Sequence, residues 1–282
     1  MNKSASLICA LITTFIWGTA FIAQDTGMDN IGPLTFNSAR FFVGFLFMLP
    51  VALIIERKKI ISEINSNKKL FFKYYMFMGV SLFLGTSLQQ AALQYTNIAN
   101  AAFFTIFYVP IVPILLFFFY KIKVHWSIWP SIVMCIIGVY LLSNFSDSQI
   151  MLGDALVILC SLVWALHIIF AGKFMKKFDL PIFYASLQSI FVFSLSIIAA
   201  YVFEEIDIQK ILLEYSSILY AGILSGGVAF TLQMYAQKNI DEAPAAIIYS
   251  LEGVFAALAG WIILNQILNL DNIIGCFLIS VS

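Results

Sequence analysis

Long apolar stretches alternate with short polar segments along the whole chain. Crossing the hydrocarbon core of a membrane takes about 20 residues of α-helix. Stretches suited to this lie at residues 4–24, 32–55, 70–93, 98–120, 127–145, 153–174, 180–203, 215–237, 243–264 and 268–282. The pattern predicts an all-α membrane protein with ten transmembrane helices. The tenth stretch offers only 14 residues from Asn269 to Ser282, so we expect that helix to continue past residue 282.

The composition supports a membrane protein and excludes several other classes. Hydrophobic residues make up 62% of the chain and charged residues 11%, whereas a soluble domain is about 45–50% apolar and about 25% charged. The expected surroundings are therefore the lipid bilayer. No basic patch suited to nucleic acid occurs, so we do not expect a nucleic-acid partner. The four cysteines lie inside apolar stretches without paired spacing, which predicts neither disulfides nor a metal site. No P-loop or other cofactor motif occurs, and we expect no cofactor.

The basic residues predict how the chain is oriented in the membrane. With the amino terminus inside, 13 of the 15 Lys and Arg residues fall in segments that face the cytoplasm. Such an excess is typical of cytoplasmic loops. The outer loops hold only Lys210, and the remaining basic residue is Arg40, inside the second stretch. We therefore predict a multi-pass protein of the cell (inner) membrane with both termini in the cytoplasm.

The two halves of the chain resemble each other. The segment FIWGTAFI aligns with LVWALHII, which places Trp17 on Trp164 at an offset of 147 residues. Further on, Pro33 falls on Pro181 at an offset of 148. The halves are predicted to be residues 1–146 and 147–282, with five helices each. Because five is odd, the second half enters the membrane from the opposite side, and inverted repeats of this kind build a substrate path at their interface.

One further match does not fit this series of offsets. The segments IIGVYLLS (136–143) and IIGCFLIS (273–280) are nearly identical, but their offset is only 137. Accepting it requires a deletion of about eight residues within one pair of helices. We therefore set this match aside and expect Gly275 to correspond to Pro130, which agrees with a tenth helix continuing past the last residue.

Several short motifs resemble a known family. The chain has a Trp-Gly pair in the first stretch, an Arg-Phe pair in the second, and SLEGVFAALAGWIILNQ near its end. With the ten stretches arranged as five plus five, these resemble the drug/metabolite transporter superfamily, and most closely its EamA-type members, over essentially the whole chain. The resemblance implies a secondary carrier of amino acids, nucleotide sugars, drugs or other metabolites, with a central cavity between the halves.

The resemblance also implies which residues matter. The family's motifs fall on Trp17 and Gly18, on Arg40 and Phe41, and on Glu252 and Gly253. Gly253 replaces the proline that usually follows the glutamate, and we expect this to leave the ninth helix less kinked.

Arg40 and Glu252 are the two charges placed well inside the predicted membrane. Charged residues at this depth are costly and commonly functional. They could form a charged pair, or Arg40 could bind an anionic substrate group while Glu252 holds a proton or a cation. Alternatively, each could be satisfied locally by neighbouring polar groups.

A further set of polar and aromatic residues lies within the apolar stretches and needs partners there. The candidates for lining a substrate cavity are Trp17, Gln90, Asn100, Tyr108, Trp164, His167, Gln233 and Tyr249. Hydrogen bonding between helices is the alternative role for the amides and the histidine, and packing at the repeat junction is the alternative for the tryptophans.

These observations predict a secondary active transporter that exports small metabolites, such as amino acids, by alternating access, as a monomer or homodimer. A multidrug exporter of cationic compounds is an alternative, although the first stretch lacks the buried acid that four-span relatives carry there. An intramembrane enzyme is disfavoured, because the stretches offer one deep Glu and one His rather than a pair of aspartates or a metal-binding set.

Overall fold

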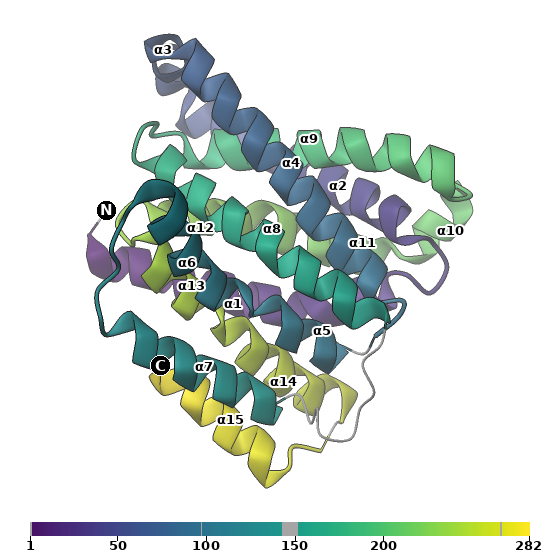
Figure 1. Ribbon diagram of the computed structural model, residues 1–282. Coiled ribbons are helices and arrows are strands. Elements are labelled where there is room, and N and C mark those ends of the chain that lie inside the picture. Colours follow the sequence, from purple (N-terminus) through teal and green to yellow (C-terminus); the bar gives the residue numbers. More distant parts are fainter. Residues whose placement is uncertain (1, 97, 143–151, 266) are drawn as a thin grey trace.

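The computed structural model describes residues 2–96, 98–142, 152–265 and 267–282, and every regular element in these ranges is a helix (Figure 1). The elements are α1 (Lys3–Thr26), α2 (Pro33–Ile55), α3 (Arg57–Ser66), α4 (Lys68–Ala92), α5 (Ile98–Thr105), α6 (Tyr108–Tyr120), α7 (Ile128–Leu142), α8 (Leu152–Met175), α9 (Pro181–Phe203), α10 (Ile208–Leu213), α11 (Tyr215–Leu219), the π-helix η2 (Tyr220–Ala229), α12 (Phe230–Gln237), α13 (Glu242–Tyr249), α14 (Leu251–Leu264) and α15 (Leu270–Val281). The predicted boundary between residues 146 and 147 lies outside the described residues.

Within the described residues, seven helical segments are long and apolar enough to cross a membrane: Lys3–Thr26, Pro33–Ile55, Asn100–Tyr120, Leu152–Met175, Pro181–Phe203, Tyr215–Gln237 and Glu242–Leu264. The helices α7 and α15 are apolar but shorter. Helix α4 has 25 residues and begins with three lysines within six positions. The prediction of an all-α membrane protein is therefore confirmed for the described residues.

Three of the apolar segments are interrupted. The segment Asn100–Tyr120, the fourth of the ten predicted stretches, is split between α5 and α6. The segment Tyr215–Gln237, the eighth, contains η2, whose wider turns include three glycines. The segment Glu242–Leu264, the ninth, is interrupted at Ser250, between α13 and α14. The N–H of Ser250 bonds to the carbonyls of both Ala246 and Ile247, which tightens the last turn of α13. Our expectation of a less kinked ninth helix stays a prediction.

The long helices pack in pairs through small residues. Helix α2 lies against α9, α4 against α8, α1 against α14, and α7 against α15. Figure 1 shows α9 and α2 along one edge of the molecule and α7 with α15 along the opposite edge. A Cβ atom at Gly18 would lie 2.6 Å from the Glu252 carbonyl oxygen, and one at Gly44 would lie 2.8 Å from that of Gly222. Such glycines let helix backbones approach closely where lipid provides no hydrophobic driving force.

Ion pairs join helix ends at one face of the molecule, where α2 ends and α9 begins. Asp179 lies 2.5 Å from Lys59 and 2.6 Å from Lys238, and Lys176 lies 2.9 Å from Asp241 and 3.3 Å from Glu242. No other ion pair occurs among the described residues. The Asp179 carboxylate thus connects the segment before α9 with α3 and with the end of α12.

We predict that Asp179→Asn lowers the melting temperature by about 2 °C, because two partly exposed ion pairs are lost. The hydrogen bonds from Lys238 and Lys59 lower the pKa of Asp179 below its ordinary value of 3.8. The stabilisation is therefore present above that value and is lost as the pH falls through the lowered pKa. Thermal unfolding of both proteins should differ at pH 7 and converge toward pH 2. Glu205→Gln, in an exposed loop, is the control; an equal effect there would contradict the prediction.

Candidate functional site

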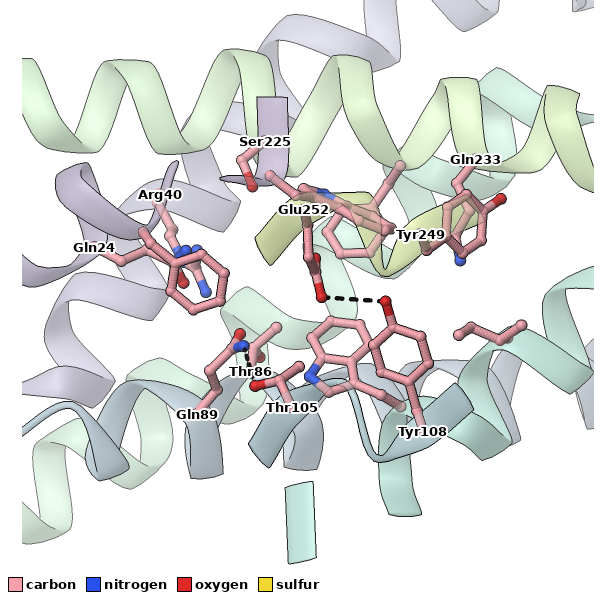
Figure 2. Close-up of a pocket in the computed structure, with 15 residues that line it drawn as sticks. Gln24, Arg40, Thr86, Gln89, Thr105, Tyr108, Ser225, Gln233, Tyr249 and Glu252 are labelled. Carbon is pink, nitrogen blue, oxygen red and sulfur yellow. Dashed lines mark hydrogen bonds between the residues drawn. The ribbon is translucent and has the colours of Figure 1, made fainter. Parts of the chain in front are cut away.

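A cavity lies among the helices of both halves (Figure 2). Its walls come from α1, α2, α4, α5, α6, α8, η2, α12, α13 and α14. The lining residues are Trp17, Phe21, Gln24, Arg40, Thr86, Gln89, Thr105, Tyr108, Trp164, Ile168, Ser225, Phe230, Gln233, Tyr249 and Glu252. Such a mixture of aromatic surface and a few polar groups is typical of a site for a small molecule.

Aromatic rings form one wall of the cavity. The ring centroid of Trp17 lies 6.4 Å from Trp164, 5.2 Å from Phe230 and 5.6 Å from Tyr249. Trp164 also stacks on Phe230, with the two planes 15° apart. The two tryptophans that the repeat relates therefore meet at the junction of the halves, and both line the cavity.

Glu252 occupies the first turn of α14, directly after the break at Ser250, and is only 6% exposed. Its Oε1 accepts a hydrogen bond of 3.2 Å from the hydroxyl of Tyr108, which is the first residue of α6 after the break in that segment. Among the described residues, no cation forms an ion pair with Glu252. Burying an unpaired carboxylate is costly, so this group is best satisfied when it holds a proton or has a cationic group beside it.

Arg40 lies in another part of the same cavity. Its Nε donates a 2.8 Å hydrogen bond to Oδ1 of Asn37, one turn earlier in α2, and its guanidinium lies 4.9 Å from the ring centre of Phe41. Figure 2 shows Arg40 beside Gln24, whereas Glu252 reaches toward Tyr108. The hypothesis of a charged pair between Arg40 and Glu252 is wrong: the two line one cavity without forming an ion pair in the part of the chain that the structure describes.

Three predicted cavity residues lie outside the lining. The Gln90 side chain donates a 2.7 Å hydrogen bond to the carbonyl of Gln24, and His167 shares a 2.7 Å hydrogen bond with Gln188. Asn100 is buried within α5. The placement of these three in the cavity wall is therefore corrected, and the hydrogen bonds of Gln90 and His167 match the alternative of contacts between helices.

Sequence reasoning missed several lining residues: Phe21, Gln24, Thr86, Thr105, Ile168, Ser225 and Phe230. Gln89 lines the cavity, whereas its neighbour Gln90, the residue that we predicted, does not. Consecutive residues point about 100° apart on a helix, so one of such a pair faces the cavity and the other does not. The periodicity of apolar residues in α4 does not indicate which of the two glutamines faces the cavity, because α4 packs on several other helices.

Several residues that line the cavity have buried polar atoms without partners among the described residues. The indole N–H of Trp164, both polar atoms of the Gln233 amide and the hydroxyl of Tyr249 are buried without a hydrogen-bond partner among the described residues. Because buried polar groups normally have partners, these donors and acceptors can bind the polar groups of a small molecule in the cavity. Together with Glu252 and Arg40, they provide sites for donors, acceptors and either charge.

Comparison with known proteins gives a consistent result. The model of the EamA-like transporter family matches residues 4–144 and again residues 151–282. An uncharacterized transporter of Archaeoglobus fulgidus is 31% identical over 276 residues, covering 98% of this chain and 83% of the relative. The uncharacterized transporter YoaV of Bacillus subtilis is 23% identical, covering 94% of this chain and 91% of the relative.

A solved crystal structure has the same fold, with a TM-score of 0.78 at 13% identity, covering 99% of this chain and 95% of that one. The family model matches each half separately, in agreement with the internal similarity of the sequence. The chain belongs to the EamA-like transporter family, within the drug/metabolite transporters, and is a multi-pass membrane transporter.

Proposed function

We propose that this transporter is a secondary exporter of small metabolites such as amino acids, and that it works by alternating access through the central cavity. The observation that carries the proposal is that cavity: both halves line it, aromatic rings wall it, and several of its lining residues have buried donors or acceptors without partners among the described residues. The sequence contains no P-loop, so the energy would come from an ion gradient or from solute exchange.

The pattern of helix contacts supports ten membrane helices arranged as two inverted repeats, residues 1–146 and 147–282. Counterparts contact each other directly in two cases, α2 with α9 and α7 with α15. Other contacts occur as related sets: α4 packs on α8, and α1 packs correspondingly on η2 and α12. Likewise α1 packs on α14, and α8 packs correspondingly on α5 and α6. A two-fold relation between the halves produces this pattern.

The contact between α7 and α15 revises one part of the predicted repeat. A Cβ atom at Gly138 would lie 2.8 Å from the Gly275 carbonyl oxygen, and one at Gly275 would likewise overlap the Gly138 carbonyl. Equivalent residues meet reciprocally at a two-fold axis. This closest approach favours the offset of 137 residues that we set aside, with Gly138 rather than Pro130 as the counterpart of Gly275.

The charge distribution supports an orientation for the repeats. The face with the ion pairs of Asp179 and Lys176 is proposed to be cytoplasmic, with both chain termini on that side of the cell membrane, because it carries most of the basic residues. Gln24 and Gln89, near the ends of α1 and α4, extend the cavity toward the opposite, outer face.

The lining favours an amphiphilic solute. Aromatic rings suit an apolar side chain, while Arg40 offers a cation for a carboxylate and Glu252 a carboxyl for an ammonium group or a coupled proton. A zwitterionic amino acid carries groups of each of these kinds. We propose that the protein works as a monomer or homodimer; the cavity lies within one chain, so one copy is enough to form the site.

Counterflow in proteoliposomes tests the function. Purified protein, with an unlabelled solute inside, is given labelled amino acids, nucleobases or cationic drugs at two imposed pH gradients. We expect accumulation of at least one zwitterionic solute, with protein-free liposomes as the control. Accumulation of the cationic drugs alone would favour the multidrug alternative. Accumulation of no member of the panel would overturn the metabolite-carrier proposal.

A further inference from the structure

The first turn of α2 is closed by a carboxylate from a distant helix. Pro33 begins α2 and has no N–H, so Leu34 and Thr35 carry the next free backbone donors. Glu204, the residue directly after α9, accepts both N–H groups at 2.8 Å and the Thr35 hydroxyl at 2.7 Å. The end of α9 is thereby bonded to the beginning of α2.

The first turn of α9 is closed in the same way at the other face. Pro181 begins α9, and the N–H groups of Ile182 and Phe183 follow it. Glu56, directly after α2, accepts them at 3.1 and 2.8 Å and is only 4% exposed. Glu56 and Glu204 are 148 residues apart, as are the donors that they bind. The two helices are therefore clamped reciprocally, each by the glutamate that follows the other.

We propose that Glu56 and Glu204 are positioning residues that keep α2 and α9 assembled as one rigid pair in every state of the transport cycle. The inference rests on the proposed alternating access. In an inverted repeat the halves exchange conformations between the two states. The contact of α4 with α8 then exchanges with that of α1 with α12, whereas the contact of α2 with α9 maps onto itself.

The two faces of the molecule differ in their ion pairs but not in the backbone bonds to Glu56 and Glu204. Among the described residues, the ion pairs of Asp179 and Lys176 lie at the face of Glu56, and none lies at the face of Glu204. Each glutamate nevertheless accepts two consecutive backbone N–H groups at similar distances, and Glu204 accepts the Thr35 hydroxyl as well. Backbone bonds that are alike at two otherwise unequal faces do not depend on which face is closed. Moreover, the pair contributes a single residue to the cavity lining, Arg40 of α2.

Gly32 makes the Glu204 clamp possible. A Cβ atom at this position would overlap the Glu204 carboxylate, while the Gly32 backbone itself has an ordinary extended conformation. Gly32→Ala should therefore displace the carboxylate without altering it, and should behave like Glu204→Gln. For both variants we expect a maximal counterflow rate lowered by about threefold or more and an unchanged KM, because the cavity is untouched.

Cross-linking tests whether the pair stays assembled. In a variant with the four cysteines replaced, Phe42→Cys and Phe193→Cys face each other across α2 and α9, where the native rings lie 4.8 Å apart. A bifunctional thiol reagent should leave counterflow within about twofold of the untreated variant. Phe77→Cys with Phe170→Cys, across α4 and α8, is the comparison and should lose transport on cross-linking. Loss of counterflow on cross-linking the first pair would overturn the proposal.

A distance measurement tests the clamps without any transport assay. Spin labels on Ile54→Cys and Tyr201→Cys, which are 82% and 83% exposed, report on opposite ends of the pair. In lipid nanodiscs, one unchanged distance peak is expected across solutes and pH values, and Gly32→Ala should broaden it. A peak that moves with solute or pH in the otherwise native protein would overturn the inference. Absence of counterflow in the native protein, by contrast, would overturn only the proposed function.

Discussion

Glu252→Gln should abolish gradient-driven accumulation and spare exchange of solute across the membrane. The glutamine nearly matches the glutamate in size and can still accept the hydrogen bond from Tyr108, but it cannot take up or release a proton. If Glu252 carries the coupled proton, accumulation against a gradient should fall at least about tenfold, because an intramembrane carboxyl of this kind is the site that links solute to protons. Proteoliposome uptake under an imposed pH gradient, compared with counterflow at equal pH, measures the two activities separately.

Two further variants sharpen that experiment. Tyr108→Phe removes the donor to Glu252 and keeps the carboxyl, so gradient-driven uptake should persist with a changed pH dependence. Glu63→Gln lies in α3, outside the cavity, and should leave both activities unchanged. Normal accumulation by the Glu252→Gln protein would exclude Glu252 as the coupling site and leave its hydrogen bond to Tyr108 as its structural role.

Gly18→Ala should cost about 1–3 kcal/mol of stability and most of the transport activity, because it overpacks the contact of α1 with α14. The added methyl group would lie 2.6 Å from the Glu252 carbonyl oxygen and 2.8 Å from the Ala256 backbone nitrogen. Both atoms belong to backbone and cannot rotate away, so α1 and α14 must separate. That separation would also displace Glu252 and Trp17, which line the cavity. Thermal unfolding and counterflow of the purified variant measure the two effects.

Gly253→Ala is the matched control, in the same helix α14 but outside its contact with α1. A methyl group there would meet the terminal Cδ1 of Ile106 at 3.0 Å and Leu142 at 3.7 Å. The ends of these side chains can move, so stability should change by less than about 1 kcal/mol. Equal losses of stability in the Gly18 and Gly253 variants would contradict the prediction that the close backbone approach at Gly18 causes the loss.

Each part of the fold that the sequence predicted correctly follows from the cost of exposing backbone and charge to lipid. The apolar stretches predicted from residues 4–24 and 32–55 became α1 and α2 with their ends shifted by at most two residues, because only a helix satisfies its own backbone in hydrocarbon. The same cost singled out Arg40 and Glu252. The sequence repeat also brought Trp17 and Trp164 to attention, and both line the cavity.

The breaks within helices escaped prediction for a related reason. Ile106 and Phe107, between α5 and α6, are as apolar as their neighbours, and the single Ser250 hardly lowers the hydropathy of its stretch. Such a break is tolerated only where surrounding helices cover the freed backbone groups. These breaks place Tyr108 and Glu252 in first turns that face each other. The site thus depends on local backbone geometry that periodicity does not record.

The sequence by itself determined that this is a helical transporter with a repeated half and two deep charges. Hydropathy, charge and similarity depend only on which residues occur and on their order along the chain. Only the tertiary structure decided that Arg40 and Glu252 do not pair, that Gln89 rather than Gln90 lines the cavity, and that Glu56 and Glu204 clamp distant helices. These outcomes depend on the rotation of each helix about its axis and on which helix it meets. Close packing between residues far apart in the chain sets both, and no local pattern specifies it.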